Sequence, residues 1–241
     1  MSLSELPEPV RRRAAGVWKF RAQAEAIAAG RFQQIARDLR RTGAPQVVIE
    51  LSEQAALEEA RHLELCIELI RELGGNVAPP TIPHLEVEPH LARQERGLLL
   101  QVVATCCINE TISAAILGEM LRLARPGRVH DTVQEILRDE INHGRIGWAL
   151  LAHEAAQGSL EDVSSNITWM LDAAITDELL SGHELADPDA ESADLGTLPR
   201  ASRFRLFHDA LNDLVFPGFE AFSISLEEPK SWLDQFATRG S

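Results

Sequence analysis

Several residue types that would point to particular functions are scarce in this chain of 241 residues. Its three cysteines, two of them adjacent at 106 and 107, cannot build a disulfide framework, so we expect a reducing compartment. No basic tract occurs beyond Arg11-Arg12-Arg13, and the net charge is −14. Because polynucleotide binding depends on lysine and arginine neutralising phosphates, we expect no nucleic-acid partner, and no anionic membrane surface either. These features favour a cytoplasmic protein that acts on a small molecule.

No segment has the pattern of a targeting or membrane-spanning sequence. The N-terminal arginines are followed by alternating polar residues, whereas a secretory signal continues with an apolar run. Residues 98–117 are mostly apolar over about 20 residues, the length that a bilayer requires. However, Asn109 and Glu110 lie at the centre of this stretch, so we expect it to be a core helix of a soluble bundle.

The chain does contain two copies of Glu-x-x-His, each preceded along the chain by a single glutamate. The copies are Glu59-Ala60-Arg61-His62 and Glu140-Ile141-Asn142-His143, and the preceding glutamates are Glu25 and Glu110. Residues i and i+3 of a helix share one face, so each copy presents a carboxylate beside an imidazole. Four carboxylates and two imidazoles suit iron, manganese or zinc, and they could bridge two such ions.

The spacing of these residues from two predicted turns places all six at one level. Helices predicted over residues 8–41 and 45–73 meet at a tight turn, with Glu25 about 18 residues before it and the first motif about 16 to 19 residues after it. Glu110 is about 16 residues before the turn at 125–127, and the second motif follows that turn by about 14 to 17 residues. At about 1.5 Å per residue, each hairpin brings its ligands to mid-height.

Two of the glutamates stand out from the solvated glutamates of surface helices. Glu25 is the only carboxylate in the middle of its helix, among alanines, and Glu110 lies inside the apolar stretch. An unpaired buried carboxylate costs several kcal/mol or takes up a proton, so each of them needs a partner such as a metal ion. A buried salt bridge would explain any one pair but not six residues at one height.

We therefore predict an all-α protein in which a four-helix bundle with a di-metal site occupies residues 1–158. Residues 159–241 are predicted to form additional helices that pack on the bundle within the same domain. The proline-rich connection at 76–89 is long enough to cross the bundle and to bring the third helix parallel to the second. After the bundle we predict helices at 160–181, at 199–216 with a break or bend at Pro217-Gly218, and at 231–236, and an acidic, mobile loop at 186–198.

On these residues, the chain resembles the ferritin-like di-iron carboxylate superfamily over roughly residues 8–158. Both motifs carry an acid directly before the first ligand, Glu58 in one and Asp139 in the other. The resemblance implies that each acid hydrogen-bonds the histidine of the opposite motif, Asp139 to His62 and Glu58 to His143, which would fix the imidazole tautomer. Arg61 and Asn142, inside the motifs, are further candidates for supporting the ligands; a solvated helix pair is the alternative for Glu58 and Arg61.

Several features that are typical of particular branches of this superfamily are missing from the chain. No Cys-x-x-Cys module like that of rubrerythrins is present, and the chain has no tyrosine on which a ribonucleotide reductase subunit could store a radical. About 80 residues beyond the bundle distinguish it from ferritins. In length and in the run 139–148 it is similar to aldehyde-deformylating oxygenases and to the tRNA hydroxylase branch, although its acidity disfavours tRNA. Ile136 stands where N-oxygenases carry an additional histidine ligand.

The helical neighbours of the ligands predict a small, apolar substrate pocket. Its predicted lining includes Phe32, Cys106, Ala114, Ile136, Leu137 and Gly144. Ser113, one turn after Glu110, is a candidate proton relay, with a hydroxyl bonded back to its own helix as the alternative. His183 and His208 are candidates for an extra ligand, with surface or loop roles as the alternative.

The resemblance implies an O2-activating di-iron oxygenase or oxidase that acts on a small, largely apolar organic substrate. Its cofactor would be two iron ions, with manganese or a mixed Mn/Fe pair as options, and O2 would be the co-substrate. Electrons would come from a partner such as a ferredoxin or a reductase. The alternative is a ferroxidase or peroxide-scavenging protein without an organic substrate. The oligomeric state stays open, with a homodimer as one option.

Overall fold

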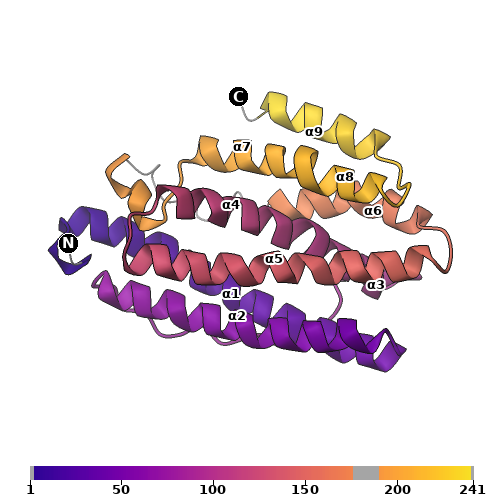
Figure 1. Cartoon of the computed structure of the whole chain (residues 1–241), viewed down its shortest axis with the longest axis horizontal. Coiled ribbons are helices and arrows are strands. Elements are labelled where there is room, and N and C mark those ends of the chain that lie inside the picture. Colours follow the sequence, from indigo (N-terminus) through magenta and orange to yellow (C-terminus); the bar gives the residue numbers. More distant parts are fainter. Residues whose placement is uncertain (1–2, 176–189, 240–241) are drawn as a thin grey trace.

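The computed structural model describes residues 3–175 and 190–239, and all regular secondary structure within them is helical. The all-α class is therefore confirmed. Four long segments form a bundle (Figure 1). They are α1 (Glu8–Thr42), α2 (Gln46–Glu72), the continuous run of α3 (Gly97–Val102), η3 (Val103–Asn109) and α4 (Glu110–Leu123), and α5 (Arg128–Ala155).

The two N-terminal helices form the predicted hairpin. Gly43 has φ of 72°, a left-handed conformation that glycine adopts without steric cost, and it ends α1 as a C-cap. Its backbone N–H lies at the carbonyls of Leu39 and Arg40 at the end of α1. Pro45 then precedes the first residue of α2, where a missing N–H costs nothing. The short connection makes α1 and α2 antiparallel neighbours.

A long connection then crosses the bundle, so that α2 and the α3–α4 run point toward the same end of the molecule (Figure 1). It is fastened to α1 by two arginines: Arg31 donates to the Glu86 carbonyl at 2.6 Å and Arg37 to the Leu85 carbonyl at 2.9 Å. Gly30 allows the close approach, because a Cβ there would lie 2.4 Å from the Pro83 carbonyl oxygen.

The third segment of the bundle contains an irregularity that the sequence pattern did not predict. Its middle part, η3, is a π-helix that ends at Asn109, directly before Glu110. Such wide turns are rare in proteins, and those that occur often lie at functional sites. The segment packs tightly on α5, since a Cβ on Gly147 would lie 2.6 Å from Cys107 Sγ and 2.8 Å from Cys106 Cβ.

Gly97–Leu123 is the one described helix that is long and apolar enough to cross a membrane. However, 78% of its most apolar window is buried inside the molecule. Its apolar side chains therefore form the interior of the bundle, as expected from the position of Glu110.

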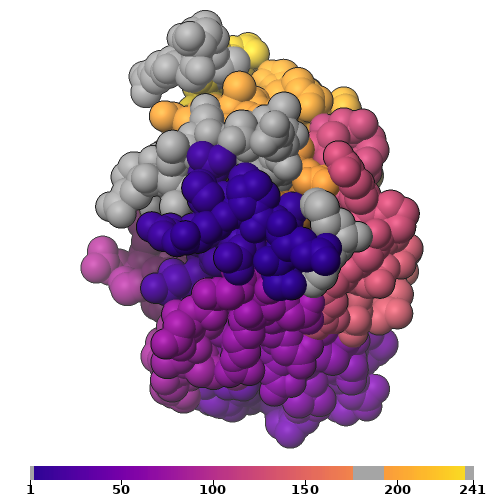
Figure 2. Space-filling model, turned by 90° about the vertical axis from the view of Figure 1, so that its left-hand side faces the viewer, coloured from indigo at the N-terminus to yellow at the C-terminus, as the bar shows by residue number. Residues whose placement is uncertain are grey.

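The C-terminal helices cover the bundle on the side opposite α2, as Figures 1 and 2 show. They are α6 (Glu161–Ala174), α7 (Arg200–Ala210), the π-helix η6 (Leu211–Val215), α8 (Phe216–Glu220) and α9 (Glu227–Arg239). The shorter 3-10 helices are η1 (Leu3–Glu5), η2 (Leu91–Arg93) and η5 (Ala190–Leu195).

Three expectations for this region need correction. The helix that begins at Arg200 does not break at Pro217-Gly218 but continues to Glu220; the π-helix η6 lies directly before Pro217, which cannot donate a backbone hydrogen bond. The described part of the predicted mobile loop, from residue 190, contains η5, and Trp18 donates a 2.9 Å hydrogen bond to the Leu195 carbonyl. The last helix begins at Glu227 rather than at 231. Residues 176–181 of the predicted fifth helix lie outside the described residues.

The contact between Gly147 and η3 makes a prediction about stability. Gly147→Ala should lower the free energy of unfolding by about 1–2 kcal/mol, because overpacking exceeds the gain in helix propensity. The matched change Gly118→Ala, at a helical glycine whose added Cβ meets nothing within 4 Å, should raise it by about 0.5–1 kcal/mol. Urea unfolding followed by circular dichroism measures both. Equal effects of the two changes would contradict the tight contact.

Candidate metal centre

All six residues of the doubled motif lie in the core of the bundle. Glu25 comes from α1, Glu59 and His62 from α2, Glu110 from the start of α4, and Glu140 and His143 from α5. None has more than 6% of its surface exposed. Because the hairpins place each residue near mid-helix, the structure brings all six together.

The six residues form two groups that could each hold a metal ion. We call the group of Glu25 and His62 the first position and the group of Glu110 and His143 the second position. Glu59 and Glu140 belong to both, and within each group one ligand atom from every residue lies within 4.8 Å of the others. The two shared carboxylates therefore lie between one Glu–His pair on each side, an arrangement that could bridge two ions.

The oxygens of Glu59 are divided between the two positions. Its Oε1 lies 2.9 Å from Nδ1 of His143 and its Oε2 lies 3.4 Å from Nδ1 of His62. Oε2 of Glu140 lies 3.2 Å from the same nitrogen of His143. Both imidazoles thus direct Nδ1 toward the carboxylates, and their ring centroids are 6.0 Å apart.

The other nitrogen of each histidine meets the acid that precedes the opposite motif. Asp139 Oδ2 lies 3.1 Å from His62 Nε2, and Glu58 Oε2 lies 2.9 Å from His143 Nε2. A carboxylate at Nε2 favours the tautomer that carries its proton there and leaves the Nδ1 lone pair free for a metal ion. This is the crosswise pairing that the resemblance implied.

The residues around Asp139 differ in what they contribute. Arg61, about one third exposed, donates to Asp139 and to Glu135, so it connects α2 with α5. Asn142 does not support the ligands as we expected. It is exposed, its amide donates to the Arg138 carbonyl at 3.3 Å, and its oxygen accepts from Arg145 at 3.0 Å.

Arg21 is a member of the site that sequence reasoning missed. Its Nε lies 3.0 Å from Glu25 Oε1, and its Nη2 lies 3.7 Å from Glu140 Oε1. The same Nη2 donates to Ser113 Oγ at 3.0 Å. A spacing of four residues before Glu25 on α1 was the available signal. Ser113 thus accepts a hydrogen bond from Arg21. Its role as a proton relay stays a prediction.

Burial and neighbouring charges give three of the four carboxyl groups clearly different pKa values. Burial and the neighbouring Glu140 and Glu25 raise the pKa of Glu59 to about 7. Burial and the charges of Glu140 and Glu59 raise the pKa of Glu110 well above its usual value. For Glu25 burial acts in the same direction, but Arg21 and His62 outweigh it and lower the pKa to about 2.

The two imidazoles are held in the charged form without a metal ion. Burial opposes their protonation, yet hydrogen bonds to Glu25 and Glu59 raise the pKa of His62 to about 11. Hydrogen bonds to Glu140 and Glu59 likewise raise the pKa of His143 to about 11. The protonated imidazoles therefore supply positive charge among these carboxylates.

A metal ion fits this set of donors. Both carboxylate oxygens of Glu59 and Nδ1 of His62 are buried and have no hydrogen bond of regular geometry. Such atoms are costly in a protein interior unless a cation satisfies them. Carboxylate and imidazole donors are suited to iron, manganese and zinc.

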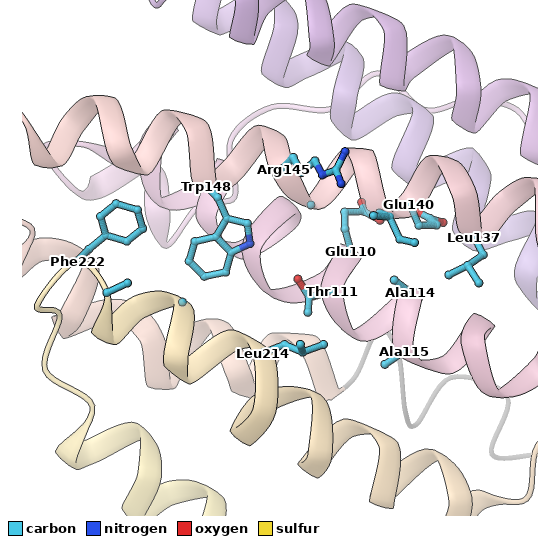
Figure 3. A pocket seen from close by; sticks show the side chains of 14 residues that line it. Glu110, Thr111, Ala114, Ala115, Leu137, Glu140, Arg145, Trp148, Leu214 and Phe222 are labelled. Carbon is cyan, nitrogen blue, oxygen red and sulfur yellow. The ribbon is translucent and has the colours of Figure 1, made fainter.

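An apolar cavity of about 580 Å³ adjoins the second position (Figure 3). Glu110 and Glu140 form part of its wall, and the remaining lining comes from α4, α5, η6 and the region of α8. Of the predicted pocket residues, Ala114, Leu137 and Gly144 line it. Three others are fully buried and absent from its wall, namely Phe32, Cys106 and Ile136. Instead, the ring of Phe32 lies 5.2 Å from that of His143.

Several cavity residues were not predicted from the sequence. On α5 the wall includes Arg145 and Trp148, which follow Ile141 at helical spacing and so share its face. Leu214 and Phe222 come from the C-terminal region, whose packing the sequence does not reveal. The hydroxyl on the cavity wall belongs to Thr111, not to Ser113.

Of the two remaining histidine candidates, His208 lies outside the two metal-binding groups. His208 on α7 is 44% exposed at its side chain and contacts Asp209 and Asn212. The position of His183 lies outside the described residues.

Comparison of the chain with protein-family models, with curated proteins and with solved structures found no match. The chemistry of the site therefore rests on its own geometry.

Metal binding should strengthen as pH rises. Since the pKa values of His62 and His143 are about 11 and that of Glu59 is about 7, these groups hold protons at neutral pH that a metal ion must displace. We expect the apparent affinity for Mn²⁺ or Zn²⁺ to increase about tenfold per pH unit for each proton released between pH 6 and 8. Calorimetry in buffers of different ionisation enthalpy counts the protons. Binding that releases none would contradict the protonated site.

The crosswise pairing predicts a loss of affinity in Asp139→Asn. Removing the charge that faces His62 should weaken metal binding about 10- to 100-fold while the fold is kept, because the imidazole loses its fixed tautomer. Asn142→Ala, on the exposed face of the same helix, is the matched control and should bind metal as the wild type does. Competition with a chelating dye measures both. Equal affinities of the two variants would exclude the supporting role of Asp139.

Proposed function

We propose that the chain is a ferritin-like di-iron protein that uses O2 to oxidise a small, largely apolar organic substrate. One observation carries the proposal: Glu110 and Glu140 belong to a metal position and also line the apolar cavity. A molecule in the cavity would therefore lie against the ligands of the second position. A ferroxidase or a peroxide scavenger needs access for ions or peroxide, but it has no use for an apolar chamber.

In this proposal the side chains hold two metal ions and keep them apart from bulk water. Glu59 and Glu140 would bridge, while Glu25 with His62 and Glu110 with His143 would complete the two positions. Iron, when bound, would supply the electron exchange with O2 that no amino-acid side chain provides. The preference for iron over manganese follows from the resemblance, since the donor set suits both.

The cavity would position the substrate. Leu137 and Ala114 line it near the ligands, and Trp148 lines it farther along α5 (Figure 3). The Trp148 ring is held by Phe219 at 5.2 Å between centroids, and a Cβ on Gly218 would lie 2.5 Å from it. Such a wall, which is open to solvent at Ile141 and Leu214, favours a flat or aliphatic body of modest size. The Thr111 hydroxyl is the group on this wall that could hold a proton next to the substrate.

Electrons for repeated turnover would come from a partner such as a ferredoxin or a reductase. The chain itself has no tyrosine that could store an oxidising equivalent as a tyrosyl radical. Insertion of one oxygen atom of O2 leaves the other atom to be reduced to water by two electrons beyond those of the substrate, so we expect each turnover to depend on an external donor.

Filling the cavity separates an oxygenase from a ferroxidase. Ala114→Phe should leave the binding of two Fe²⁺ per chain intact and lower substrate-dependent turnover at least tenfold, because Ala114 lines the cavity but is no ligand. Ala152→Phe, on an exposed position of α5, is the matched control. The assay adds 18O2 and a reductant to the Fe²⁺-loaded protein with a panel of medium-sized aldehydes, amines and arenes. Mass spectrometry then detects labelled products.

Two outcomes would contradict the proposal. Iron mineral formation at equal rates in both variants, with no labelled product from any compound, would indicate a ferroxidase. Fewer than two Fe²⁺ bound per chain in the wild type would exclude the di-iron centre itself.

A further inference from the structure

Among the described residues, Arg21 is the one arginine that forms ion pairs with the ligands of the metal centre. Arg21 is 14% exposed at its side chain and reaches residues of α1, α4 and α5, since it contacts Glu25, Ser113 and Glu140. Its guanidinium is charged at all relevant pH values. A fixed positive charge inside a site that would hold divalent cations needs an explanation, because it repels the ions that the carboxylates attract.

The contacts of Arg21 select one oxygen of Glu25 for the metal. Oε1 of Glu25 faces Arg21 at 3.0 Å, whereas Oε2 lies 3.6 Å from Nδ1 of His62 and so points into the first position. Glu25 would therefore bind an ion there through Oε2 alone. Arg21 thus acts as a positioning residue for this carboxylate.

The shared carboxylate of Glu140 is divided in the same way. Its Oε1 lies 3.7 Å from Arg21 Nη2, whereas its Oε2 lies 3.2 Å from Nδ1 of His143 in the second position. An ion in the first position would compete with Arg21 for Oε1. An ion in the second position would meet an oxygen that does not face the guanidinium.

The second position has no comparable cation. Among the described residues, Glu110 forms no ion pair with an arginine or a lysine, and its nearest charged neighbours within the groups are the carboxylates of Glu59 and Glu140. Protons in the second position can leave when a metal ion arrives, whereas the guanidinium of Arg21 keeps its charge beside Glu25 in the first position.

We propose that Arg21 makes the two metal positions unequal, so that the second position binds its ion first and more tightly. This inference rests on the di-metal centre proposed above. The ion beside the apolar cavity would be the one that stays bound, and the ion beside Arg21 would be the one that exchanges. The nearly symmetric ligand set, one Glu and one His per position, would then have a defined order of loading.

Titration with Mn²⁺, followed by the electron paramagnetic resonance signal of the free ion, tests the order. The wild type should bind two ions in steps whose dissociation constants differ at least tenfold. Arg21→Gln, which removes the charge, should tighten the second step and narrow this difference at least tenfold. Arg21→Lys keeps the charge and should keep the difference, which separates electrostatics from packing.

Ligand variants assign the steps. Glu25→Ala should remove only the weaker step, and Glu110→Ala should remove only the tighter step. These two variants decide the order even if Arg21→Gln does not fold, which circular dichroism would show. Loss of the tighter step in Glu25→Ala, or an unchanged difference in a folded Arg21→Gln, would overturn the role of Arg21. A wild-type chain that binds no Mn²⁺, Fe²⁺ or Zn²⁺ would instead overturn the di-metal centre.

Discussion

The burial of four carboxylates within one helical bundle is the constraint on which the rest of this structure depends. Each of them would cost several kcal/mol if it were buried and charged alone. The fold offsets this cost with two imidazoles and one guanidinium, and the proposed metal ions would add further positive charge. Without such ions the balance is incomplete, because burial and the repulsion between the carboxylates raise the pKa values of Glu59 and Glu110. The site is therefore held in a form that gains stability when protons are exchanged for metal ions.

The backbone serves this constraint by bringing helices close where ligands must converge. Gly147 lets α5 approach the π-helix η3, and η3 ends at the residue before Glu110. A wide turn at this point rotates the side chains of the following residues about the helix axis. Glu110 then faces the metal-binding groups, and both Glu110 and Thr111 line the cavity. The second π-helix, η6, contributes Leu214 to the same cavity. Both departures from regular α-helix thus adjoin the place where substrate would meet the ligands.

The sequence predicted the ligand-bearing helices well, because their signals are local. Helical spacing and the turns at Gly43 and Gly127 were sufficient to place six residues at one height, and the acid before each motif indicated a partner for each histidine. Arg21, Trp148 and Leu214 were missed for a different reason. Their roles depend on how a helix face meets a neighbour far along the chain, and an arginine one turn before a glutamate also fits a solvated surface pair. The pocket was predicted in part: Leu137 and Gly144 neighbour Glu140 on α5 and line the cavity, whereas Cys106 and Ile136 neighbour the ligands in sequence but fill the core.

The duplicated motif gives the two metal positions the same ligand types, and what breaks this equivalence lies outside the motif. Arg21 occupies one side, and the cavity opens on the other, where Glu110 and Glu140 form part of its wall. A symmetric pair of sites would be adequate for binding iron, but oxidation of an organic molecule requires that substrate approach from one direction and that charge be balanced from another. The difference between the two positions, with Arg21 beside Glu25 and an apolar cavity beside Glu110, is therefore what favours the proposed oxygenase function over iron storage.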